Sequence, residues 1–187
     1  MQSPFYFIAK PVNGRRYDNT KDIGGVEFIV STSEEDHKFS NRLAEVVELP
    51  LKYTGPIQKG DILLVHHNVF KFYNDMKGRQ KSGKSFFRDD NFFIEPDQFF
   101  MYKHGSTWNA YDRYCFVKPI PATDSYIKKP FSEEPLMGIM KYPNEYLIQN
   151  GVKSGDNVCF RPDTEYEFIV DGEKLYRMYD NQITMKI

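Results

Sequence analysis

The sequence predicts an all-β protein, and two observations support this prediction. The chain of 187 residues contains 16 Phe and 13 Tyr, which favour the half-buried surface of a pleated sheet. Its 11 prolines separate short apolar runs, and no stretch has the long periodicity of an amphipathic helix. Short strands at regular spacing, divided by turn residues, indicate small barrels.

An internal repeat divides the chain into two parts. Four sequence blocks occur in the same order twice, at residues 7–12, 45–47, 57–65 and 92–100, and again at 115–120, 137–140, 152–160 and 176–183. A repeat of this kind predicts one structural unit used twice. We therefore expect two tandem small β-barrels, with domains at residues 1–104 and 105–187, each near the size of a small independent fold.

The first copy predicts strands separated by two long excursions, at about residues 12–44 and 71–91. We expect strands at residues 5–10, 43–49, 61–65, 68–73 and 99–102, and a hairpin whose turn is residues 88–91. Residues 13–25 are polar and rich in glycine, which is typical of a loop. The short apolar segment at residues 26–30 interrupts this polar stretch, and it is either a strand end or a segment that contacts a partner.

The second copy predicts a more compact version of the same scheme. Residues 104–110 are the expected linker, and Asp171-Gly172 marks a hairpin between residues 166–170 and 174–179. Cys115 and Cys159 both lie in expected strands. We expect reduced, buried thiols, because two isolated cysteines are more typical of a cytosolic chain than of a disulfide scaffold.

Composition narrows the class of protein. The net charge is −1 and the isoelectric point is about 6.4, whereas a dedicated nucleic-acid binder usually has a basic surplus. No apolar run approaches the ~20 residues of a membrane-spanning helix, and the first residues lack the basic region of a signal peptide. We therefore expect a cytoplasmic protein that binds neither nucleic acid nor membrane.

Candidate metal ligands and catalytic groups are few. His66 and His67 are adjacent, and neighbours on a strand point to opposite faces; His37 and His104 have no acidic or Cys partner at ligand spacing. Residues 83–85 (Gly-Lys-Ser) match only the end of a phosphate-binding loop and lack its structural context. The sequence therefore predicts no metal site, no cofactor and no catalytic residue, and we do not expect an enzyme.

One basic segment has two interpretations. It contains five basic residues with aromatic neighbours: Lys77, Arg79, Lys81, Lys84 and Arg88. Basic and aromatic side chains together can hold single-stranded nucleic acid. Because the whole chain is nearly neutral, we favour a solvated hairpin tip above an aromatic core.

The order of the blocks resembles the GroES-type co-chaperonins. The residues that carry this resemblance in the first copy are 7–10, Gly24-Gly25-Val26-Glu27-Phe28, 44–47, Lys59-Gly60-Asp61-Ile62-Leu63 and 93–100. The second copy matches at residues 116–118, 138–140, 152–156 and 176–183. The tandem arrangement is similar to the double co-chaperonins of plastids.

The resemblance implies a non-enzymatic protein that assists folding. Members of this family form rings of identical subunits that cap a chaperonin chamber, contact client proteins only indirectly, and dock through a mobile loop with a short apolar segment after Gly-Gly. The matching residues are Gly24, Gly25, Val26, Glu27 and Phe28. A charge in an apolar groove costs desolvation energy, so a shifted contact through Phe28, Ile29 and Val30 is the favoured version.

The second copy lacks a Gly-Gly-apolar segment, and the family's roof hairpin is short here, at residues 48–56. Tyr126 and Ile127 are the candidate replacement in the second loop, although a structural role for this copy is the stronger expectation. These departures support an alternative, a non-enzymatic structural or assembly protein, such as a phage virion component that reuses the fold. A phage-encoded co-chaperonin would act in the host cytoplasm.

Overall fold

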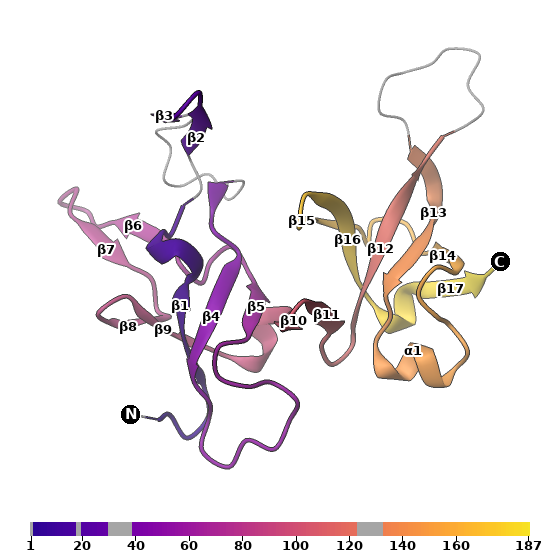
Figure 1. Ribbon diagram of the computed structural model, residues 1–187, viewed down its shortest axis with the longest axis horizontal. Coiled ribbons are helices and arrows are strands. Elements are labelled where there is room, and N and C mark those ends of the chain that lie inside the picture. Colours follow the sequence, from indigo (N-terminus) through magenta and orange to yellow (C-terminus); the bar gives the residue numbers. More distant parts are fainter. Residues whose placement is uncertain (1, 18–19, 30–38, 123–132) are drawn as a thin grey trace. The chain divides into compact units, whose positions relative to one another are not determined.

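The computed structural model describes residues 2–17, 20–29, 39–122 and 133–187 (Figure 1). The chain divides into two compact units, Met1–Thr107 and Trp108–Ile187. Both consist of antiparallel strands, which confirms the all-β class. The predicted barrels are not confirmed, because neither main sheet closes on itself among the residues described. Val30, Tyr126 and Ile127 lie outside those residues.

The larger sheet has seven strands in the order β11-β10-β5-β4-β1-β9-β8, and all of them except β11 belong to the first unit. Its strands are β1 (Phe7–Pro11), β4 (Leu43–Glu48), β5 (Ile62–Val65), β8 (Phe86–Arg88), β9 (Asn91–Ile94), β10 (Phe99–His104) and β11 (Thr107–Ala110). Two separate hairpins fill the excursions: β2 (Thr20–Ile23) with β3 (Val26–Ile29), and β6 (Phe72–Asn74) with β7 (Gln80–Ser82). Short 3-10 turns lie at Val12–Gly14 and Pro96–Gln98.

The second unit is a six-stranded sheet with the order β15-β16-β12-β13-β14-β17. Its elements are β12 (Tyr114–Pro121), β13 (Glu133–Tyr142), α1 (Glu145–Gln149), β14 (Asn157–Phe160), β15 (Tyr166–Val170), β16 (Glu173–Tyr179), a 3-10 turn at Asp180–Gln182, and β17 (Ile183–Lys186). This order matches β8-β9-β1-β4-β5-β10 of the first unit. Six strands therefore follow one topology in both units.

The same turn precedes strands β5 and β14. In the first unit the Gly60 N–H donates to the Val46 carbonyl (2.8 Å), and in the second the Gly155 N–H donates to the Met140 carbonyl (2.8 Å). Both glycines have positive φ, +86° and +92°, a conformation that other residues adopt only at a cost. The turn holds β5 against β4 and β14 against β13.

Each unit has its own apolar core. In the first unit, aromatic rings pack edge to face, with centroids 5.4 Å apart for Phe7 and Phe99 and 4.8 Å apart for Phe70 and Phe92, the arrangement that ring quadrupoles favour. One cluster in the core of the second unit is mainly aliphatic and sulfur-containing: Cys115, Val117, Met140, Leu147, Val152, Val158, Phe160 and Met178. Aromatic rings are buried in the second unit as well, among them Phe116 and Phe168 with centroids 6.1 Å apart, so the predicted aromatic surplus serves both cores.

Local turn chemistry accounts for the hairpins predicted from the sequence. The β8–β9 turn places Asp89 and Asp90 at φ 50° and 55°, and the β15–β16 turn places Asp171 and Gly172 at φ 48° and 80°. Two consecutive residues at positive φ match the right-handed twist of the flanking strands. Both predicted hairpins are confirmed by their strand pairing.

Three element predictions were wrong. Residues 20–23, predicted as loop, form strand β2, which pairs with β3. Residues 68–71 are mostly turn, and the strand starts only at Phe72. The expected linker at residues 104–110 contains the end of β10, a turn at Gly105 and strand β11. In the first and third cases a polar sequence pairs as a strand, because neighbouring strands supply the partners that local composition cannot reveal; in the second, a segment that was predicted as strand forms a turn instead.

We expect Gly138→Ala to destabilise the second unit by about 1–3 kcal/mol through overpacking. A Cβ at this position of β13 would overlap the Val117 side chain and lie 2.7 Å from the Lys118 carbonyl oxygen. Chemical denaturation followed by fluorescence measures the change. Gly172→Asn is the control, because no atom lies within 4 Å of that position and Asn tolerates its backbone conformation; equal losses in both variants would contradict the steric explanation.

We also expect the two thiols to differ in reactivity. Burial, with the charge of Asp180, raises the pKa of Cys115 to about 12, so thiolate is scarce there, whereas Cys159 is only half-buried. Iodoacetamide followed by mass spectrometry should modify Cys159 first in the folded protein. Cys115 should react only after unfolding in denaturant, and early labelling of Cys115 would show that this core opens readily.

Candidate functional site

The candidate site is the β2–β3 hairpin, which the sequence had predicted only as a loop followed by an apolar segment. Its strands pair through Thr20 with Ile29 and through Ile23 with Val26, across the turn Gly24-Gly25. Both glycines have positive φ, 66° and 84°, as a two-residue turn between twisted strands requires.

An exposed apolar pair lies at the tip of this hairpin. Ile23 is 63% exposed and Val26 is 57% exposed, and the two residues are directly opposite each other on either side of the turn. Directly opposed residues in antiparallel strands have Cβ atoms about 4.5–5.5 Å apart. The tip therefore presents two aliphatic side chains side by side to solvent.

The structure brings most of the predicted site residues into this one hairpin. Gly24 and Gly25 form its turn, and Val26, Glu27, Phe28 and Ile29 form strand β3. Ile23 was missed by the sequence analysis, because it was assigned to the polar loop before Gly24. The signal that identifies it is a Gly-Gly pair between two β-branched residues, which is itself a hairpin pattern.

The chain enters and leaves this region at one place. Tyr17 and Ser40 form an antiparallel bridge, and the Asn41 N–H donates to the Arg16 carbonyl (2.9 Å). The side-chain amide of the buried Asn41 also donates, to the carbonyls of Val12 (3.0 Å) and Arg15 (2.7 Å). We call residues 16–17 and 40–41 the neck of the loop.

The predicted basic segment is balanced by acidic residues. Arg79 and Lys81 lie 3.7 Å and 3.6 Å from the Asp75 carboxylate. Lys84 lies 3.5 Å from Glu95, and Arg88 lies 4.0 Å from Asp89. This pairing lowers the local positive potential on which binding to phosphates depends, and it favours the interpretation of the β6–β7 hairpin as a solvated surface feature.

The histidines differ from the sequence prediction in two respects. His66 and His67 follow β5 in a turn, and their ring centroids lie 4.1 Å apart, so the argument from opposite strand faces was wrong. His104 has an acidic partner after all, since its Nδ1 lies 2.8 Å from the buried Asp61 carboxylate. Across the described ranges, no three His, Cys, Asp or Glu side chains gather as a metal would require.

A charged cluster in the second unit borders a cavity of about 240 Å³. Lys174 Nζ lies 2.9 Å from Glu133 and 3.3 Å from Glu167, and the Tyr176 hydroxyl donates to Glu133. The hydrogen bond to Glu133 raises the pKa of Lys174, and burial raises the pKa of Tyr176. Both shifts move titration further above neutral pH, so this cluster keeps a fixed charge pair and does not resemble a general acid or base.

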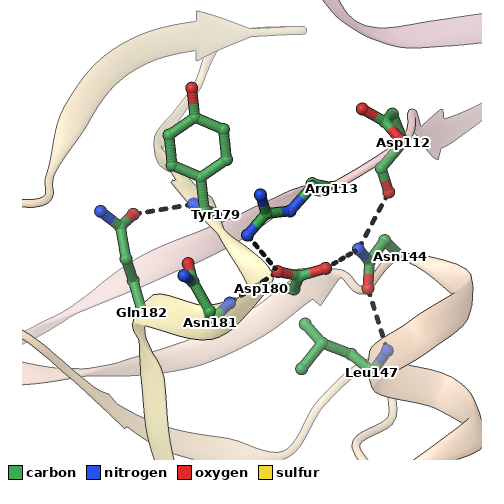
Figure 2. Close-up of polar contacts among 8 residues, drawn as sticks. All are labelled: Asp112, Arg113, Asn144, Leu147, Tyr179, Asp180, Asn181 and Gln182. Carbon is green, nitrogen blue, oxygen red and sulfur yellow. Dashed lines mark hydrogen bonds and ion pairs between the residues drawn. The ribbon is translucent and has the colours of Figure 1, made fainter.

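A buried polar network anchors the short helix α1 (Figure 2). The Asn144 side chain accepts from the Leu147 N–H (2.9 Å) and donates to Asp180 (3.0 Å) and to the Asp112 carbonyl (2.9 Å). Arg113 lies 3.7 Å from the other Asp180 oxygen. An N-cap of this kind satisfies the free N–H groups of the first turn. The network links α1 to the 3-10 turn before β17.

Comparison with known proteins gives no family assignment: no protein-family model matches the chain, and no curated protein matches it significantly. No helix within the described ranges has the length and apolar character needed to cross a membrane.

The second unit should lose stability in acid because of Glu173. Hydrogen bonds from Lys118 (2.7 Å) and Lys141 (2.9 Å) lower the pKa of Glu173 below its ordinary 4.5. A lowered pKa gives stability that is complete above the unfolded pKa and is lost as pH falls through the folded one. Melting temperatures between pH 6 and 3 should therefore fall less steeply for Glu173→Gln than for the wild type. Asp163→Asn, at an exposed turn, should keep the wild-type slope.

Proposed function

We propose that this protein is a non-enzymatic, co-chaperonin-like protein that docks on a chaperonin ring through the β2–β3 hairpin. The observation that carries this proposal is the exposed pair Ile23 and Val26 at the tip of a Gly-Gly turn. Exposed aliphatic side chains at a hairpin tip suit an apolar groove on a partner. The order of sequence blocks that resembles the GroES-type family supports the choice of a chaperonin as this partner.

A single hairpin of this kind binds weakly. Full burial of one aliphatic side chain contributes about 1.5–3 kcal/mol, and two such side chains leave little after the loss of rotational and translational freedom. Several copies of the chain arranged in a ring would bind the chaperonin ring simultaneously and so gain avidity. We therefore propose a homo-oligomer that acts in the cytoplasm and assists client proteins indirectly.

The proposal includes two GroES-like domains, at residues 1–104 and 105–187. It is supported by the six-strand order common to both units and by the matching turns at Gly60-Asp61 and Gly155-Asp156. If the first domain supplies the docking hairpin and the second domain only extends the ring, only one of the two copies needs a Gly-Gly-apolar segment.

A second candidate is an assembly protein without chaperonin contact, and the open sheets favour it. Strands β15 and β17 lie at the two edges of the six-stranded sheet, and each carries an exposed apolar residue, Ile169 and Met185. Unpaired edges of this kind are available to pair with another chain. Copurification with particles, rather than with a chaperonin, would favour this second function.

The direct experiment is a pull-down with a purified chaperonin, with and without ATP, followed by native mass spectrometry. A nucleotide-dependent complex of fixed stoichiometry is expected, and the mass gives the number of chains in each cap. If the protein is folded and oligomeric but forms no complex with the chaperonin, the result would contradict docking and favour the assembly function.

The hairpin tip should be essential for docking. Ile23→Ser with Val26→Ser should weaken chaperonin binding at least about 100-fold, because avidity multiplies the loss at each site, while thermal stability stays within about 0.5 kcal/mol. Ile169→Ser is the matched control, because Ile169 is 61% exposed in the other unit. Phe28→Ser with Ile29→Ser tests the contact predicted from the sequence. Undiminished binding in both double variants would rule out this hairpin as the docking element.

A further inference from the structure

The two long excursions of the first unit occur together. Between β5 and β8 the first unit has residues 66–85, which include the β6–β7 hairpin, whereas the corresponding connection of the second unit is only residues 161–165. The first unit also carries β2–β3 between β1 and β4. The contacts of Arg16 and Tyr17 show that the second excursion touches the neck from which the first one leaves.

Arg16 joins the neck to the second excursion. Its guanidinium carbon lies 4.2 Å from the ring centroid of Phe72, 4.9 Å from that of Phe86 and 4.7 Å from that of Phe92. Three rings around one cation, in a side chain only 11% exposed, form a strong cation–π arrangement, because little water competes for the charge.

Directed hydrogen bonds fix the same guanidinium. Its two terminal nitrogens donate to the Ser82 hydroxyl and to the Asp90 carboxylate, both at 2.9 Å. Ser82 belongs to β7, and Asp90 belongs to the β8–β9 turn. The planar fork of arginine satisfies two acceptors while its face lies against the aromatic rings, a combination that lysine cannot reproduce.

Tyr17 adds a second link. Its hydroxyl accepts the Phe72 N–H (3.2 Å), and its ring stacks on the Phe72 ring at a centroid distance of 6.0 Å. Because Tyr17 bridges to Ser40, and the Arg16 carbonyl accepts the Asn41 N–H, the same contacts hold the outgoing and the returning chain.

We propose that Arg16 is a positioning residue that clamps the neck shut against the second excursion, so that residues 17 and 40 leave the sheet as one fixed pair. This inference rests on the proposed docking function. In a closed neck, the entropy cost of bringing the two ends of the loop together has already been met before binding. The apparent affinity rises with the fraction of molecules already in the competent state. The β6–β7 hairpin supplies part of this clamp, through Phe72 and Ser82.

Hydrogen exchange tests the clamp without any partner. In Arg16→Ala, the amides of Asn41 and Phe72 should exchange about tenfold faster, because their acceptors lie on the released neck. Arg79→Ala is the matched control, since Arg79 lies on the β6–β7 hairpin and is largely exposed. Arg16→Lys provides a milder variant that keeps the charge without the fork. Unchanged exchange in both Arg16 variants would overturn the proposal.

Chaperonin affinity tests the consequence for docking. Arg16→Ala should raise the apparent Kd about tenfold at unchanged stoichiometry, as expected when the competent fraction falls tenfold. A disulfide between Tyr17→Cys and Ser40→Cys should restore the affinity in the Arg16→Ala chain when oxidised, and reduction should remove the rescue. Opposed residues of an antiparallel bridge lie within the range that a disulfide spans.

The outcomes separate the two proposals. Faster exchange with an unchanged Kd, or a Kd that the oxidised neck does not restore, would refute the positioning role. If the wild-type chain binds no chaperonin, the docking function fails, and the clamp is then judged by exchange alone, with protection at Asn41 regained on oxidation as the supporting result.

Discussion

The turn in which a glycine at positive φ is followed by aspartate is the constraint on which both sheets depend. In each unit its amide closes onto the preceding strand, and the Asp carboxylate accepts the N–H three residues earlier, from Gln58 (2.8 Å) or Lys153 (2.7 Å). Any residue with a Cβ would strain this backbone, and a residue without a carboxylate would leave that N–H unsatisfied. The turn thereby sets the register of β5 against β4 and of β14 against β13.

The sequence predicted those features whose cause is local. Asp171-Gly172 and residues 88–91 identified their hairpins because positive φ at the turn is a property of the turn residues themselves. Strand β2 was not predictable in the same way, because Lys21 and Asp22 are residue types depleted in strands and depend on β3 for pairing. The contact between His104 and Asp61 depends on the register of β10 against β5, which neither segment specifies alone. The Arg16 clamp needs rings from three separate strands, and no spacing in the sequence indicates it.

The two units show how one topology accommodates different tasks. Six strands keep their order, since the hydrogen bonds of a sheet tolerate little change, while the connections between them differ freely. The first unit has two hairpins in its connections and a core of packed aromatic rings. The second has α1, capped by Asn144, and a core that contains an aliphatic cluster as well as the buried rings of Phe116 and Phe168. The division fits a chain in which one copy supplies the contact and the other supplies structure.

This division has a consequence for any ring that the chain forms. Each chain contributes two units but, over the residues described, a single hairpin with an exposed Gly-Gly tip. A closed ring of identical chains therefore contains an even number of units and half as many such hairpins. An odd-numbered partner ring could be matched chain by chain only if one unit of every chain is left without a partner subunit. A ring with fewer contacts loses avidity steeply, so a chain of this design benefits from making each contact better organised before binding, which is the effect expected of a closed neck at Arg16.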